Sequence, residues 1–246
     1  MTLLKGKTAI VTGASRGIGR SIAEQLAGLG AQVVINYANS PHKAQEVVDA
    51  IRQKGGEAAA VQADLSRPAE AEALFAAALR HFGKVDILIN NAGVNKVQPI
   101  LEVTEEDFDK QFLLNAKGTF FACQQAMKHM EEKGRIINFS TSVTGHMLPA
   151  YSVYAGTKGA VEQFTRQLAK EFAVKQITIN AVAPGPVNTE LFTEGKTEQQ
   201  IEGLRKSIAL GRIGEPEDIA NVIEFLVSEK SQWVTGQTLR VNGGFI

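Results

Sequence analysis

Short runs of β-branched and apolar residues alternate with longer helical patterns along this 246-residue chain. Several runs, such as residues 85–89 (VDILI), are apolar almost throughout, which is typical of strands buried on both faces of a parallel sheet. The intervening segments are long enough for crossover helices. The pattern predicts an α/β fold with a doubly wound parallel sheet and helices on both faces. Seven strands are expected: Thr8–Thr12, Gln32–Tyr37, Ala58–Gln62, Val85–Asn90, Arg135–Ser140, Ile177–Val182 and Thr238–Val241.

The chain contains no internal repeat, low-complexity segment or linker, so we expect a single domain over residues 1–246. One stretch, Pro184–Leu210, departs from the regular alternation. It is rich in Pro, Gly and Thr near its start and polar thereafter. Because so long a loop is uncommon unless it is functional, we expect residues 186–210 to form a lid over a substrate site.

Composition and charge exclude several classes of protein. Hydrophobic residues make up 44% of the chain and charged residues 21%, as in soluble globular proteins. Lys and Arg number 26, as do Asp and Glu, and this balance argues against a nucleic-acid partner. The N-terminal residues lack a signal-peptide pattern and no stretch reaches 18 uninterrupted apolar residues, which argues against a membrane span.

The cysteine and histidine content argues against disulfides and metal. The single cysteine, Cys123, cannot form an internal disulfide or a thiolate cluster, which fits a reducing compartment. The four histidines show no shared metal-ligand spacing. We therefore expect a cytoplasmic protein without a metal site.

A glycine-rich turn, residues 13–19 (GASRGIG), follows the first predicted strand and opens a helix. Glycines in such a turn let the backbone approach a pyrophosphate, and the helix start offers unpaired N–H groups. The spacing is G-x-x-x-G-x-G, not the usual G-x-G-x-x-G, and a plain tight turn would also explain it. Its place in the first strand–helix unit favours a dinucleotide site. The expected cofactor residues here are Gly13, Ser15, Arg16, Gly17, Ile18 and Gly19.

The end of the second predicted strand, residues 36–40 (NYANS), carries no acidic residue. A carboxylate there would bind the adenosine ribose of NADH and repel a 2′-phosphate. Arg16 supplies positive charge and the side chains of Asn39 and Ser40 can donate hydrogen bonds, with Tyr37 beside them. We therefore predict NADPH/NADP+ as the cofactor.

Two further loops are expected at the same edge of the sheet. Asp64 and Leu65 follow the third strand, where Asp64 could receive the adenine amino group or simply precede a helix. Two asparagines and a glycine end the fourth strand. Asn side chains can bond backbone groups and tie neighbouring loops together, and the glycine permits close approach of a cofactor. The expected cofactor residues here are Asn91, Ala92 and Gly93.

Tyr154 and Lys158 stand four residues apart in a helical pattern, which places them on one helix face. The pKa of a phenol is about 10 and that of a lysine about 10.4. A neighbouring ammonium and a positive nicotinamide would lower the pKa of the phenol, so that it can protonate a carbonyl oxygen as hydride reaches the carbon. Such a pair is common by chance, and alone it favours a partly exposed helix face without a catalytic role.

The glycine turn, residues 90–93, Asn115, the hydroxyls at 140–142 and the Tyr154/Lys158 pair occur in one order. As a set they resemble the short-chain dehydrogenase/reductase family, in its single-domain branch, over residues 7–244. The resemblance is greatest to 3-oxoacyl-acyl-carrier-protein reductases and hydroxynaphthalene reductases. It implies a Rossmann-like seven-stranded sheet and a homotetramer.

The resemblance also implies roles for individual residues. Tyr154 would be the general acid toward the carbonyl. Lys158 would bond the nicotinamide ribose and lower the pKa of Tyr154. Asn115 would bend its helix and hold a water that relays protons to Lys158. The nicotinamide carboxamide would be held by Pro184, Gly185, Val187 and Thr189.

The hydroxyl that binds the substrate oxygen is open between two residues. The family's serine usually lies about 13 residues before the tyrosine. Counting back from Tyr154 indicates Thr141, whereas the Ser-x-x-Gly pattern at 142–145 indicates Ser142. We select Ser142, on the assumption that the loop before Tyr154 is shortened.

These expectations describe an NADPH-dependent carbonyl reductase acting on a ketone or aldehyde, such as a 3-oxoacyl thioester or a cyclic or aryl ketone. An NAD(P)-dependent alcohol or sugar dehydrogenase is the alternative within enzymes, and a non-catalytic NADP(H)-sensing protein is the alternative outside them. An acidic carrier protein would require a basic patch, yet the candidate cations near residues 128–135 and 166–175 are interrupted by glutamates.

Overall fold

A seven-stranded sheet with every strand parallel forms the centre of the computed structural model, which describes residues 3–194 and 196–246. The strand order is β3-β2-β1-β4-β5-β6-β7. The predicted α/β sheet is confirmed, and each predicted strand end lies within two residues of the observed one. The strands are β1 (Thr8–Val11), β2 (Gln32–Tyr37), β3 (Glu57–Gln62), β4 (Ile87–Asn90), β5 (Arg135–Phe139), β6 (Thr178–Pro184) and β7 (Thr238–Val241).

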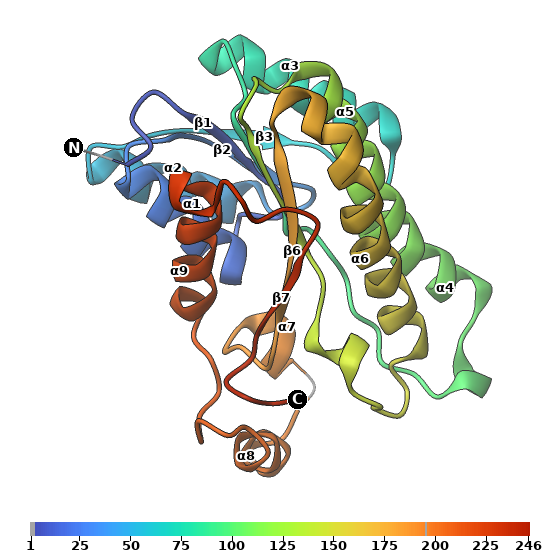
Figure 1. The fold of residues 1–246 in the computed structure, drawn as a ribbon. Coiled ribbons are helices and arrows are strands. Elements are labelled where there is room, and N and C mark those ends of the chain that lie inside the picture. The colour runs from blue at the N-terminus through green and yellow to red at the C-terminus, as the bar shows by residue number, and fades with distance from the viewer. Residues whose placement is uncertain (1–2, 195) are drawn as a thin grey trace.

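Helices cover both faces of the sheet (Figure 1). One face carries α1 (Gly17–Gly28), α2 (Pro41–Gln53) and α9 (Pro216–Val227), and the other carries α3 (Pro68–Phe82), α5 (Thr119–His129) and α6 (Ser152–Phe172). Each face of the sheet has its own hydrophobic core. In β1, Ala9 and Val11 belong to the core beneath α1, α2 and α9, whereas Ile10 belongs to the core beneath α3, α5 and α6. Burial on both faces explains why the central strands carry apolar residues at successive positions, as in residues 9–11 of β1.

The helix that precedes α5 contains a distorted turn. Helix α4 (Glu105–Gln111) begins at Thr104, whose hydroxyl accepts a hydrogen bond from the Asp107 N–H at 3.1 Å. The chain then widens into a π-helix, η2 (Phe112–Gly118), before α5. Turns of this kind often occur at functional sites. The remaining short helices are η1 (Ile100–Glu102), η3 (Ser142–Gly145), η4 (Ala173–Lys175) and η5 (Glu229–Ser231).

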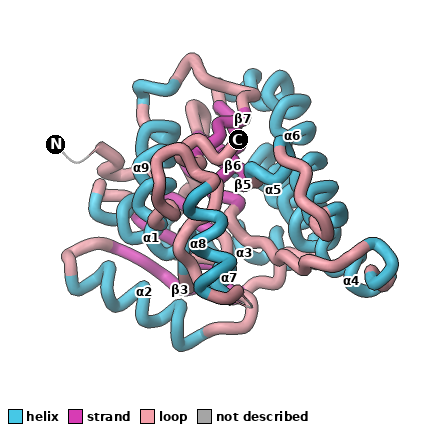
Figure 2. Tube along the Cα trace, turned by 90° about the horizontal axis from the view of Figure 1, so that it is seen from below, coloured by secondary structure: helices cyan, strands magenta, loops and turns pink. Residues whose placement is uncertain are grey.

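The strand order reverses between β1 and β4, where one half of the sheet continues through β2 and the other through β5. Loops that leave the carboxyl ends of β1 and β4 therefore diverge and leave a crevice. Two short helices of the 186–210 segment, α7 (Glu190–Thr193) and α8 (Glu198–Lys206), lie across this edge (Figure 2). A capping box between Thr197 and Gln200 begins α8, so this segment is partly helical and not the continuous loop expected from its composition.

Within the described part of the chain, no helix is both long and apolar enough to cross a lipid bilayer.

Replacing Phe75 with alanine is expected to lower the free energy of unfolding by about 3–5 kcal/mol, because its fully buried ring would leave a cavity between α3 and the sheet. Urea denaturation measures this change. The matched control is Val174→Ala, at a site 80% exposed, where a change within about 0.5 kcal/mol is expected. Equal losses in the two variants would contradict the assignment of this core.

Candidate active site

A cavity of about 690 Å³ lies at the carboxyl ends of β1 to β4. Every cofactor residue predicted between positions 13 and 93 lines it, so the structure brings together four loops that are distant in sequence. They are Gly13, Ser15, Arg16, Gly17, Ile18, Gly19, Tyr37, Asn39, Ser40, Asp64, Leu65, Asn91, Ala92 and Gly93.

The glycine turn packs too closely for side chains. A Cβ on Gly13 would lie 2.9 Å from the Ala92 Cα, and Gly13 has a φ of +61°. Asn91 Nδ2 donates hydrogen bonds to the carbonyls of Thr12 and Gly13 at 2.9 and 3.2 Å, which ties the two loops together. Among the described residues no side chain caps the start of α1, so its N–H groups face the cavity as a ready site for an anion.

Three charged side chains form a cluster of ion pairs at the rim of this cavity. Glu190, at the start of α7, pairs with Arg16 Nη1 at 3.1 Å and with Lys43 Nζ at 2.9 Å. These two cations hold the pKa of the Glu190 carboxyl below its usual value. Sequence reasoning identified Arg16 but missed Lys43 and Glu190. The one available signal was a lysine in the first turn of the helix that follows Ser40.

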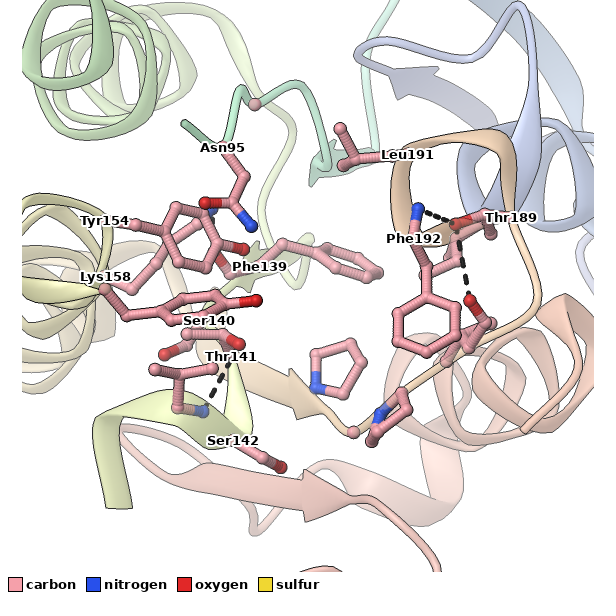
Figure 3. Close-up of a pocket in the computed structure, with 18 of the residues that line it drawn as sticks. Asn95, Phe139, Ser140, Thr141, Ser142, Tyr154, Lys158, Thr189, Leu191 and Phe192 are labelled. Carbon is pink, nitrogen blue, oxygen red and sulfur yellow. Dashed lines mark hydrogen bonds between the residues drawn. The ribbon is translucent and has the colours of Figure 1, made fainter. Parts of the chain in front are cut away.

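A second cavity, of about 190 Å³, adjoins the first and contains Tyr154 and Lys158 (Figure 3). Apart from Asn115, the remaining predicted residues line it: Ser142, Pro184, Gly185, Val187 and Thr189. Lys158 Nζ donates a hydrogen bond to the Phe139 carbonyl at 2.7 Å and lies 5.9 Å from the centroid of the Tyr154 ring. The two cavities share wall residues such as Ile18, Gly93 and Thr189, and so form one continuous site.

Burial shifts the two pKa values in opposite directions. It raises the pKa of Tyr154 to about 12, although the Thr141 side chain lowers it through a hydrogen bond, and it lowers the pKa of Lys158 to about 8. The predicted lowering of the Tyr154 pKa by Lys158 is therefore not seen in the chain by itself. The ammonium is bonded to the Phe139 carbonyl, and loss of solvent around the phenol dominates.

The two candidate hydroxyls, Ser142 and Thr141, have different surroundings. Ser142 Oγ donates to the Ala183 carbonyl at 3.1 Å and accepts from Asn242 Nδ2 at 3.1 Å. Its side chain is 1% exposed and points away from Tyr154 and Lys158 (Figure 3). The Thr141 side chain lies close enough to Tyr154 to lower the pKa of its hydroxyl. The selection of Ser142 therefore stays a prediction, with Thr141 as its alternative.

Asn115 lies in the π-helix η2, is fully buried and is not part of either cavity wall. Its amide bonds both the N–H and the carbonyl of Val94, each at 2.8 Å, and Nδ2 also donates to Thr157 Oγ1 at 3.1 Å. A Cβ on Gly93 would lie 3.2 Å from Asn115 Oδ1 and 3.6 Å from Lys158 Nζ. Asn115 therefore holds the loop after β4 close to Lys158.

The lining of the smaller cavity is mostly apolar, and Tyr151 packs edge-on against Tyr154 with ring centroids 6.4 Å apart. The lining also contains the aromatic residues Phe192 and Phe245 and the aliphatic residues Leu148, Leu191 and Leu204. Two polar residues there were not predicted from the sequence. Asn95 has a buried Oδ1 without a partner among the described residues, and Lys196 Nζ lies 4.8 Å from the Phe192 ring centroid. The described residues include no cluster of His, Cys, Asp or Glu that could hold a metal ion.

Comparison with known proteins identifies relatives over nearly the whole chain. A family model described as enoyl-(acyl carrier protein) reductase matches residues 13–246. The hydroxynaphthalene reductase-like protein Arp2 of Metarhizium robertsii is 44% identical, with 99% of this chain and 96% of that protein covered.

Solved structures show the same likeness. A short-chain dehydrogenase from Burkholderia cenocepacia in complex with NADP has a TM-score of 0.94 at 34% identity, and 99% of each chain is covered. The landomycin C-6 ketoreductase LanV with bound NADP and rabelomycin has a TM-score of 0.90 at 39% identity, covering 99% of this chain and 97% of that one.

The stability contribution of Lys158 is expected to depend on pH. Its pKa is about 8 in the folded chain and 10.5 in the unfolded chain, so between these values the unfolded chain binds more protons and stability rises with pH. Relative to Lys158→Met, the wild type should gain roughly 1–2 kcal/mol of unfolding free energy between about pH 7 and 9.5. Urea denaturation of the cofactor-free proteins measures this. If the difference in unfolding free energy between the two proteins stayed constant or fell as the pH rose, the pKa of Lys158 would not be lowered in the folded chain.

Proposed function

The chain belongs to the short-chain dehydrogenase/reductase family of oxidoreductases, and we propose that it is an NADPH-dependent carbonyl reductase. The observation that carries the proposal is the position of Tyr154 and Lys158 in an apolar cavity that opens into the large cavity along the glycine turn. A proton donor and a dinucleotide-sized cavity in contact are what hydride transfer to a carbonyl requires.

The residues of the large cavity fit NADPH. The uncapped start of α1 and the close-packed glycine turn suit the pyrophosphate, and Arg16, Lys43 and Ser40 suit a 2′-phosphate. The neighbouring structures that contain NADP support this assignment. Lys158 would bind the nicotinamide ribose, and Pro184, Gly185, Val187 and Thr189 would hold the carboxamide. When bound, NADPH supplies the hydride for the carbonyl carbon.

Tyr154 supplies the proton. With a pKa of about 12, its hydroxyl is protonated at neutral pH and can give its proton to the carbonyl oxygen as negative charge develops there. The Thr141 hydroxyl, beside Tyr154, donates a second hydrogen bond to the same oxygen and orients the substrate. Asn115 positions the loop after β4 and thereby Gly93 next to Lys158.

The apolar, aromatic wall formed by Tyr151, Phe192 and Phe245 favours a cyclic or aryl ketone as substrate. The names of the hydroxynaphthalene reductase-like relative and of the rabelomycin-bound ketoreductase are consistent with this class. A sugar alcohol would leave its hydroxyls without partners on such a wall, which disfavours the dehydrogenase alternative. A 3-oxoacyl thioester presented by a carrier protein is the less favoured carbonyl substrate.

We also infer that the chain is one domain, with residues 186–210 as the lid, and that it forms a homotetramer. Exposed apolar side chains support further assembly: Phe108 lies in α4, Leu113 in the π-helix η2, and Trp233 is 96% exposed. Cys123 is buried, and burial raises the pKa of its thiol to about 12, so it is unreactive and compatible with the reducing cytoplasm.

Replacing Tyr154 with phenylalanine is expected to lower kcat for carbonyl reduction about 10²- to 10⁴-fold, because the proton donor is lost. NADPH oxidation is measured with a panel that contains an aryl ketone, a cyclic diketone and a 3-oxoacyl thioester. Binding of NADPH to the variant, followed by calorimetry, should stay within about threefold of wild type. Full turnover in Tyr154→Phe would contradict the mechanism. If the wild type binds NADPH but reduces no member of the panel, the result would favour a non-catalytic NADP(H)-sensing protein.

Thr141→Ala and Ser142→Ala distinguish the two hydroxyls. Thr141→Ala should lower kcat about 10²- to 10³-fold, as loss of a donor to a developing oxyanion does in other enzymes. Ser142→Ala should reduce thermal stability, because Ser142 bonds Ala183 and Asn242, but change kcat of the folded enzyme less than tenfold. The reverse order of kcat losses would restore Ser142 as the substrate-oxygen donor.

A further inference from the structure

Three charged side chains from separate parts of the chain meet at the rim of the large cavity. Arg16 comes from the glycine turn, Lys43 from the first turn of α2 and Glu190 from the start of α7. The Lys43 ammonium lies 2.9 and 3.0 Å from the two Glu190 carboxylate oxygens, and Arg16 Nη1 lies 3.1 Å from one of them. Arg16 and Glu190 both line the cavity. The Glu190 carboxylate therefore joins the start of the lid segment, residues 186–210, to the glycine turn through Arg16 and to α2 through Lys43.

We call the part of the rim formed by Arg16, Lys43 and Glu190 the charged corner. It adjoins the end of β2, where Asn39 and Ser40 also line the cavity and residues 36–40 include no acid. The carboxylate that approaches the two cations is thus brought by the lid segment and not by the second strand. Lys43 and Arg16 hold the pKa of Glu190 below its usual value, so the carboxylate is ionised near neutral pH. A negative group placed here offsets the positive charge of the corner.

A 2′-phosphate at this corner requires the same two cations. A phosphate monoester carries a charge of about −1.5 to −2 near pH 7 and forms its strongest hydrogen bonds with Arg and Lys. A phosphate and the Glu190 carboxylate on the same pair of cations would repel each other. All three side chains are about half exposed, with Glu190 at 58%, so the ion pairs are weak enough to exchange with an incoming anion.

We propose that Glu190 is a cofactor-specificity residue that competes with the 2′-phosphate for Arg16 and Lys43. NADP(H) displaces the carboxylate and frees the start of α7 from the rim, whereas NAD(H), which lacks this phosphate, leaves the ion pairs in place. The next residues, Leu191 and Phe192, line the substrate cavity, so the exchange at Glu190 reaches the substrate wall through one short helix. The inference rests on the proposed function, because it requires a dinucleotide in the large cavity.

The direct test compares cofactor affinities by calorimetry in the absence of carbonyl substrate. Glu190→Gln removes the charge of the competing group and should tighten NADP+ binding about three- to tenfold, as expected for loss of two exposed ion pairs. NAD+ binding should change less than twofold. Adenosine 2′-monophosphate, used as the probe of the corner alone, should show the same gain as NADP+. High salt should reduce the gain.

The matched control is Glu202→Gln, which makes the same charge change in α8 of the lid segment. Glu202 pairs with Arg205 at 2.7 Å inside that helix, and its substitution should leave both cofactor affinities unchanged. An unchanged NADP+ to NAD+ affinity ratio in Glu190→Gln would overturn the proposal, as would weaker NADP+ binding, which would mean that Glu190 supports the phosphate site.

Limited trypsin digestion reports the release of the lid segment. With saturating cofactor, wild-type cleavage after Arg205 or Lys206 should be faster with NADP+ than with NAD+, and the two rates should become equal in Glu190→Gln. Equal rates in the wild type would overturn the release. If the wild type binds neither dinucleotide, the proposed function fails together with this inference. If it binds NADP+ and Glu190→Gln leaves the ratio unchanged, the competition fails alone.

Discussion

The reversal of strand order between β1 and β4 is the constraint on which the whole site depends. Parallel strands need crossover helices, and the chain leaves β1 and β4 toward opposite halves of the sheet, which places these helices on opposite faces. The crevice between those exits is where the glycine turn, the end of β2 and the loop after β4 meet. Asn91 makes this meeting rigid through its bonds to the Thr12 and Gly13 carbonyls.

Burial then sets the pKa values of Tyr154 and Lys158. Lys158 is held in a desolvated place by the Phe139 carbonyl, and Tyr154 lies beside it on the same face of α6. Loss of solvent lowers the pKa of the lysine and raises that of the phenol, so the chain by itself keeps the tyrosine protonated. A protonated phenol is the form that a carbonyl reduction consumes. Asn115 lines neither cavity and acts indirectly, because its amide holds Val94 and thereby the loop that carries Gly93.

The segment after β6 serves both cavities. Thr189 and Leu191 line each of them, Glu190 reaches the rim of the larger one, and Phe192 faces the smaller one. Because these residues are consecutive, a change at the cofactor rim and a change at the substrate wall share one short stretch of backbone. The opposite wall is fixed by packed strands and by α6, so specificity can change here without disturbing the core.

The sequence by itself determined the sheet, the glycine turn and the Tyr154/Lys158 pair, because each depends on local periodicity or on spacing within one element. Tertiary structure alone decided the partners of the Ser142 hydroxyl, which bonds the Ala183 carbonyl and the side chain of Asn242, 100 residues further along the chain. It also decided the ion pair between Lys43 and Glu190, 147 residues apart, and the burial of the Asn95 Oδ1 atom. Such contacts depend on how separate elements approach one another in space, and no pattern within a single element encodes that approach.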